Sequence, residues 1–167
     1  IDRPMVKMLR LALAFPSYAK LPSRQLDDNV GDVTALRGTR INFGIESNKP
    51  LAEAKLIFND LPSETGVKEG STSTFLKIEG SKASVSLPLM KKRTYHIQLK
   101  DKENVVSADP IEYTMKIVPD AYPTAQILFP GTNIHIAENA KLNMLYKITD
   151  DFGFTSLRLA YKLIQSR

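Results

Sequence analysis

One stretch decides the fold: Asp109-Pro-Ile-Glu-Tyr-Thr-Met-Lys-Ile-Val-Pro-Asp-Ala-Tyr-Pro123. The apolar side chains of its first half fall at every second position: Ile111, Tyr113, Met115 and Ile117. A period of two is typical of a β-strand with one buried face. The prolines at 110 and 119 bound this strand, because proline cannot donate to a β-ladder. A stiff hinge over residues 118–123 then leads into a new strand at residues 124–129, so we predict one β-domain followed directly by another.

Further short alternating runs precede this stretch: residues 8–15, 39–46, 51–58, 74–79, 83–87 and 94–99. Turn signals separate them every 8–12 residues or so, which is typical of an antiparallel sandwich. Residues 24–38 are polar and are expected to form turns. Residues 51–58 are ambiguous, because their alanine, glutamate and lysine favour a helix while the alternation favours a strand. We predict a strand there, and an immunoglobulin-like antiparallel β-sandwich over residues 1–119.

The remaining residues, 120–167, repeat the strand pattern. Alternating runs are expected at residues 124–129, 133–137, 141–149 and 156–164. So few residues cannot close a sandwich, so we expect the first strands of a second, incomplete immunoglobulin-like domain. An open strand edge seeks a partner, and a strand-mediated homodimer is one outcome.

Tyr95 allows two interpretations. It lies two positions before the apolar Ile97, where immunoglobulin-type domains often have a tyrosine corner whose hydroxyl turns back onto the preceding turn. An ordinary core tyrosine explains the pattern equally well. The sequence leaves both open.

Composition indicates a globular chain. Of its 167 residues 43% are hydrophobic and 25% charged, and the net charge is +5. No apolar run approaches the roughly 20 residues that cross a bilayer. Cysteine is absent, which excludes disulfides and thiolate chemistry. Because the chain starts at Ile1 and carries no signal peptide, we expect a portion of a longer protein.

The only run of basic residues is Lys91-Lys92-Arg93. A solvated loop is the simple interpretation, and a contact with an anionic surface such as lipid headgroups or acidic polysaccharide is the functional one. Clustered aromatic residues are missing around it, which argues against nucleic acid as a partner.

Acidic residues gather near the predicted domain junction: Asp109, Asp120, Glu138, Asp150 and Asp151. Calcium is bound by oxygens converging from turns, so these residues are candidate ligands, although the usual calcium-loop pattern is absent. Capping of turns and strand ends is the default. The Asp-Phe-Gly triplet at residues 151–153 lacks the companion motifs of a kinase and is expected to form a tight turn with Gly153 at positive φ.

No catalytic constellation is visible. The two histidines, His96 and His135, fall between apolar neighbours, so both are expected to point outward from their strands. No Gly-x-Ser-x-Gly elbow and no phosphate-binding glycine loop occurs. We therefore expect no enzyme activity, no catalytic residues and no cofactor.

Several motifs resemble a large uncharacterised bacterial family: Leu-Ala-Phe-Pro-Ser-Tyr-Ala-Lys-Leu-Pro-Ser-Arg at residues 13–24, Gly-Asp-Val-Thr-Ala-Leu-Arg-Gly-Thr-Arg at 31–40, Asp-Pro-Ile-Glu-Tyr at 109–113, Pro-Asp-Ala-Tyr-Pro at 119–123 and Asp-Asp-Phe-Gly-Phe-Thr-Ser-Leu-Arg-Leu-Ala-Tyr at 150–161. In that family hydrophobic N-terminal helices precede extracytoplasmic immunoglobulin-like segments, and a long helical region follows. The resemblance implies a membrane-anchored protein on the periplasmic side of the inner membrane, with the anchor outside this chain. It implies no activity.

We therefore expect a non-enzymatic module that acts as a spacer or as a platform for protein partners, whose identity the sequence does not give. The alternative from another class is a ligand-binding module. Its ligand would be calcium at the domain junction, or an anionic polysaccharide or lipid surface at Lys91–Arg93.

Overall fold

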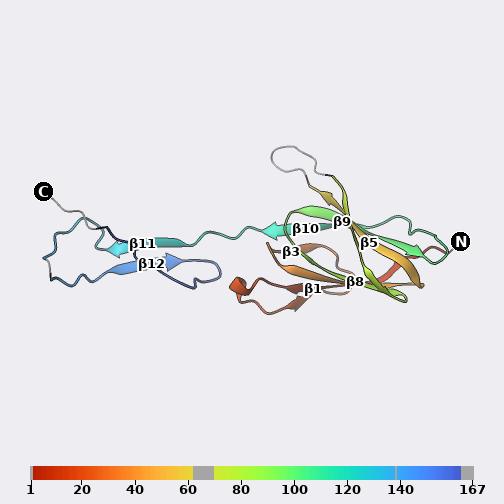
Figure 1. Ribbon diagram of the computed structural model, residues 1–167, viewed down its shortest axis with the longest axis horizontal. Coiled ribbons are helices and arrows are strands. Elements are labelled where there is room, and N and C mark those ends of the chain that lie inside the picture. The colour runs from red at the N-terminus through yellow and green to blue at the C-terminus, as the bar shows by residue number, and fades with distance from the viewer. Residues whose placement is uncertain (1, 62–69, 138, 163–167) are drawn as a thin grey trace. The chain divides into compact units, whose positions relative to one another are not determined.

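The computed structural model describes residues 2–61, 70–137 and 139–162. The chain divides into two compact units, Ile1–Pro119 and Asp120–Arg167, each containing its own β-sheets (Figure 1). The division falls at Pro119, within the segment that the sequence interprets as a hinge. No helix in the described ranges is long and apolar enough to span a membrane.

The described residues of the first unit form two five-stranded sheets. Sheet A has the order β2-β1-β4-β8-β7, and its strands are β2 (Arg24–Gln25), β1 (Val6–Ala14), β4 (Arg40–Ser47), β8 (Lys82–Pro88) and β7 (Lys77–Glu79). Sheet B has the order β3-β10-β9-β5-β6, and its strands are β3 (Val33–Leu36), β10 (Glu112–Val118), β9 (Arg93–Asp101), β5 (Leu51–Asp60) and β6 (Thr72–Phe75). One short 3₁₀ turn, η1 (Ser17–Ala19), follows β1. The predicted all-β sandwich is confirmed.

The core of this unit lies between the two sheets. The inward positions alternate along each strand, as the sequence predicts, and the largest fully buried side chains are Leu9, Leu11, Ile41, Phe43, Leu56, Phe58, Leu89, Tyr95, Leu99 and Met115. Each such side chain stabilises the fold by roughly 1.5–3 kcal/mol through burial. Residues 51–58 are a strand, because β5 pairs with β9 on one side and with β6 on the other, and this pairing overrides their helix propensity.

Two predictions of strand limits are wrong in the first unit. The strand after Pro110 begins only at Glu112, and Ile111 is 67% exposed instead of lying on the buried face. Residues 74–79 do not form one strand. The chain leaves sheet B after β6 and joins sheet A as β7, and the buried Leu76 between them donates its N–H to the carbonyl of Ala54.

The prediction that residues 24–38 are only turns is also wrong, because β2 and β3 lie within them. β3 pairs with β10 in parallel, with Val33 opposite Met115, whereas the other strand pairs are antiparallel. Gly38, which ends this segment, has φ +86°, the left-handed conformation that glycine adopts most easily.

The described residues of the second unit form one two-stranded antiparallel sheet, sheet C, made of β11 (Thr124–Phe129) and β12 (Leu145–Thr149). The predicted strand at residues 133–137 does not form, and the predicted strand at 141–149 is shortened to β12. The described part of the predicted strand at 156–164 is not in a ladder either. An alternating sequence forms a strand only where a neighbouring strand offers partners for its backbone hydrogen bonds. Neither strand of sheet C pairs with residues 133–137 or 156–162.

Candidate binding surfaces

Tyr95 on β9 is hydrogen-bonded to the loop that precedes β3. It is fully buried, and its hydroxyl donates a hydrogen bond of 2.5 Å to the carbonyl of Gly31, 64 residues away. The tyrosine-corner interpretation is therefore wrong, because the acceptor does not lie in the preceding turn. Burial raises the pKa of Tyr95 far above its usual value, so the hydroxyl stays protonated and acts as a structural donor.

Gly31 is required by the side chain that packs on it. A Cβ atom at this position would lie 2.3 Å from the ring of Tyr113, which is too close for two carbon atoms that are not bonded to each other. The neighbouring Asp32 accepts a hydrogen bond of 2.7 Å from the backbone N–H of Thr114. These contacts fasten the β2–β3 loop to β9 and β10, which is a structural role.

Asp101 is the most buried carboxylate among the described residues, at 2% exposure. Lys49 Nζ lies 2.8 Å from one carboxylate oxygen, and the backbone N–H groups of Glu103 and Val105 each donate to the other at 2.9 Å. The hydrogen bond from Lys49, together with these backbone donors, lowers the pKa of Asp101. Its oxygens are occupied in holding a turn, which leaves little capacity for acid–base chemistry.

The basic triplet is largely engaged within the protein. Lys91 forms an ion pair of 2.5 Å with Asp60, and the Arg93 guanidinium lies 3.7 Å from the centroid of the Phe58 ring. Partial burial lowers the pKa of Arg93. Lys91 and Lys92 are both exposed, whereas Arg93, the first residue of β9, is partly buried. The structure therefore leaves two of the three basic side chains open to solvent.

The candidate calcium ligands lie in both units. Asp109 belongs to the first, and Asp120, Asp150 and Asp151 belong to the second, while Glu138 lies outside the described residues. Within the described ranges no group of three or more acidic or histidine side chains is arranged to hold a metal ion.

The carboxylates that follow β12 cap backbone groups. Asp150 accepts from the N–H of Phe152 at 3.2 Å, and Asp151 accepts from the N–H of Ala121 at 3.4 Å. Gly153 has φ +82°, which confirms the predicted positive φ, but the triplet forms a bend after β12 and the described residues that follow it are in no strand.

The two histidines belong to different units. His96 is partly exposed on β9 between the buried Tyr95 and Ile97, which agrees with the predicted outward direction. His135 is exposed, but it is not in a strand.

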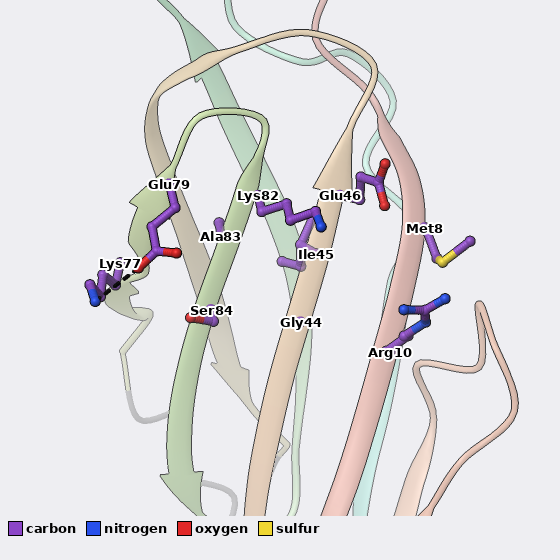
Figure 2. A pocket seen from close by; sticks show the side chains of 10 residues that line it. All are labelled: Met8, Arg10, Gly44, Ile45, Glu46, Lys77, Glu79, Lys82, Ala83 and Ser84. Atoms are coloured by element: carbon purple, nitrogen blue, oxygen red, sulfur yellow. Dashed lines mark ion pairs between the residues drawn. The ribbon is translucent and has the colours of Figure 1, made fainter.

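A hollow on the outer face of sheet A is the first surface that the sequence did not indicate. The strand register places Arg10, Gly44, Ser84 and Lys77 side by side in one row across β1, β4, β8 and β7. Because Gly44 has no side chain, the row is open at its centre, and the hollow measures about 250 Å³ (Figure 2). We name it the Gly44 hollow, and it is lined by Met8, Arg10, Gly44, Ile45, Glu46, Lys77, Glu79, Lys82, Ala83 and Ser84.

Charged side chains surround the Gly44 hollow. Arg10 pairs with Asp28 at 3.2 Å and Lys77 with Glu79 at 2.9 Å. Both pairs are exposed, so they are weak and can rearrange around a ligand. Figure 2 shows the side chain of Lys82 extending from β8 toward β4, over the strand that carries Gly44.

The apolar face of sheet C is the second such surface. Two cross-strand pairs, Ala125 with Ile148 and Ile127 with Tyr146, lie on one face, and polar pairs such as Gln126 with Lys147 lie on the other. Ile127 is 49% exposed and Tyr146 54% exposed. A groove of about 290 Å³ opens on the apolar face. We name it the ribbon groove, and it is lined by Ala125, Gln126, Ile127, Met144, Tyr146, Ile148, Leu157, Arg158 and Leu159.

Comparisons with known proteins do not identify the chain: no protein-family model and no curated protein matches it. Its function is therefore argued from these two surfaces and from the contacts that hold the first unit together.

Proposed function

We propose that this chain is a non-enzymatic, immunoglobulin-like module of a larger membrane-anchored bacterial protein, acting outside the inner membrane as a spacer and protein-interaction platform. The contacts of Tyr95 and Asp101 support a structural role, because both groups are occupied by backbone partners. The extracytoplasmic location and the anchor rest on the resemblance described above.

The exposed apolar face of sheet C is the observation that carries the interaction role. A two-stranded ribbon is only marginally stable in water on its own. Clustered exposed apolar side chains mark surfaces that another protein covers. The ribbon groove therefore needs an occupant with apolar side chains on one face, which is the pattern of an extended strand.

We assign this occupant to a second copy of the chain. Residues 156–162 carry Leu157, Leu159 and Tyr161 at alternating positions, and these side chains are 47%, 63% and 82% exposed. The segment thus has the pattern of a strand without a ladder in the structure. The charges of this segment are opposite to those at the end of sheet C. Arg158 and Lys162 are basic, and the acidic Asp150 and Asp151 directly follow β12. Reciprocal exchange of this segment between two copies would form a closed twofold dimer.

Light scattering coupled to size exclusion tests the assignment over a wide range of protein concentration. The wild-type chain is expected to form a dimer that dissociates on dilution. Ile127→Arg places a charge in the ribbon groove and should give a monomer with the first unit intact. Met90→Arg changes a similarly exposed side chain of the first unit, at 48% exposure, and should leave the dimer unchanged. A wild-type chain that stays monomeric at the highest concentration would refute the second copy as occupant.

A further inference from the structure

Gly44 is a residue that the fold does not require. It lies in β4, the central strand of sheet A, between β1 and β8. Its φ is not in the left-handed region, and an added Cβ would lie 3.8 Å from the Arg10 carbonyl oxygen, which is ordinary contact. Gly31 differs sharply, because a Cβ there would collide with Tyr113. Glycine weakens a strand interior and often marks a place where a ligand approaches the backbone closely.

The neighbours of Gly44 keep the surface low and polar. Ser84 is its partner on β8 in the same row. The next row across sheet A consists of small or hydrogen-bonding side chains, namely Gln25, Ala12, Asn42 and Ser86. Hydroxyl and amide groups can both donate and accept hydrogen bonds. This face therefore offers a shallow floor that can bond to a hydroxyl-rich ligand.

Basic residues slightly outnumber acidic ones on this face. The outer face of sheet A carries Arg10, Arg40, Lys77 and Lys82 against Glu46 and Glu79, and Asp28 pairs with Arg10. Arginine and lysine bind carboxylates through charge-assisted hydrogen bonds. Figure 2 shows the Lys82 side chain extending toward β4, whereas the Arg10 guanidinium extends from β1 away from Gly44. Arg10 would therefore reach a ligand over Gly44 only by turning away from Asp28, with which it forms an exposed pair at 3.2 Å.

We propose that the Gly44 hollow binds an acidic polysaccharide, with a uronate sugar over Gly44, its carboxylate on Lys82, and Arg10 turning from Asp28 to join it. The sugar hydroxyls bond to Ser84 and to the amide and hydroxyl side chains of the neighbouring row. Charge and hydrogen bonds hold this ligand, without aromatic stacking. The site belongs to the first unit and does not depend on the dimer proposed above.

The geometry disfavours other polymers. A peptide recognised by strand addition needs an open sheet edge, whereas Gly44 lies in the middle of sheet A. Single-stranded nucleic acid needs aromatic side chains for stacking, and the described lining of the hollow contains none. An anionic lipid surface shares the charge requirement, and the experiment therefore includes it.

Calorimetric titration of the full chain with a polygalacturonate oligomer at low salt tests the site, with maltohexaose as the neutral control. The wild type should bind the uronate and not the neutral sugar. Gly44→Val fills the hollow and should weaken binding at least about tenfold, because a displaced hydrogen-bonded group is worth a factor of this order. Its melting temperature should be unchanged or higher, because valine favours strands.

Two matched charge variants locate the site. Lys82→Gln should weaken uronate binding about threefold, as expected for one exposed ionic contact. Lys92→Gln removes the same charge from the basic triplet and should have no effect. If Gly44→Val does not fold, Gly44→Ala and Lys82→Gln decide the question.

Four results would overturn the proposal. They are no uronate binding by the wild type, equal binding of the neutral sugar, full binding by the Gly44 variants, or a larger effect of Lys92→Gln than of Lys82→Gln. Binding to phosphatidylglycerol vesicles without binding to the uronate would likewise reject it, and would assign the face to a membrane surface instead.

Discussion

The two units of this chain use the same alternating sequence pattern with opposite results. In β1 the pattern places Leu11 in the core with no exposed surface, whereas in β11 it leaves Ile127 49% exposed. The difference lies in the layers, because sheet A faces sheet B while the described residues of the second unit form no second sheet against sheet C. Alternation therefore determines which face of a strand is apolar, and a facing layer determines whether that face is buried.

Truncation of an apolar side chain gives the largest test of this contrast. Phe43→Ala should lower the free energy of unfolding of the first unit by about 3–5 kcal/mol, because it leaves a cavity between the sheets. Ile127→Ala should lower the free energy of unfolding of the second unit by less than about 0.5 kcal/mol, because Ile127 is half exposed. Urea denaturation followed by circular dichroism measures both. Equal losses would show that the second unit is as well packed as the first.

The two glycines of the first unit sharpen the comparison at a smaller scale. Gly31→Ala should destabilise the first unit by about 1–3 kcal/mol, because the new methyl group collides with the Tyr113 ring. Gly44→Ala should be neutral or stabilising by up to about 1 kcal/mol, because the site has room and alanine is less flexible in the unfolded chain. Thermal melts of the two variants check this. A destabilised Gly44→Ala would show that the fold needs this glycine.

Acid should lower the stability of the first unit by protonating Asp101. Its pKa is lowered in the folded state by Lys49, so its contribution is complete above the unfolded value of about 3.9. The contribution is lost as the pH falls below that value and through the folded pKa. Denaturation midpoints of wild type and Asp101→Asn across this range should converge at the lowest pH. Parallel curves would contradict the role of the Lys49 pair.

The strands of the first unit were predictable where the pattern is long. β4 shows Ile41, Phe43 and Ile45 at alternating positions, and each is buried. β3 was missed, because it has only four residues and lies among turn residues. Its place depends on parallel pairing with β10, a contact between distant segments that no local pattern reveals.

The candidate sites were less predictable. The run Lys91–Arg93 is visible in the sequence, yet Arg93 packs on Phe58, a contact set by the pairing of β5 with β9. The Gly44 hollow was not visible, because Arg10, Ser84 and Lys77 reach Gly44 only through the register of four strands. A glycine at an outward strand position was the one local signal. The sequence alone could not show whether the fold requires this glycine, because that depends on whether a Cβ atom would fit at the site.

Hydrogen exchange measured by mass spectrometry at several protein concentrations tests the central claim most directly. The amides of β4 and β9 should be strongly protected at every concentration, because both are interior strands that are paired on both sides in five-stranded sheets. Those of β11 and β12 should exchange quickly in dilute solution and become protected as the concentration rises. Strong protection of β11 and β12 in the dilute monomer would contradict the account, because it would show that the second unit needs no partner.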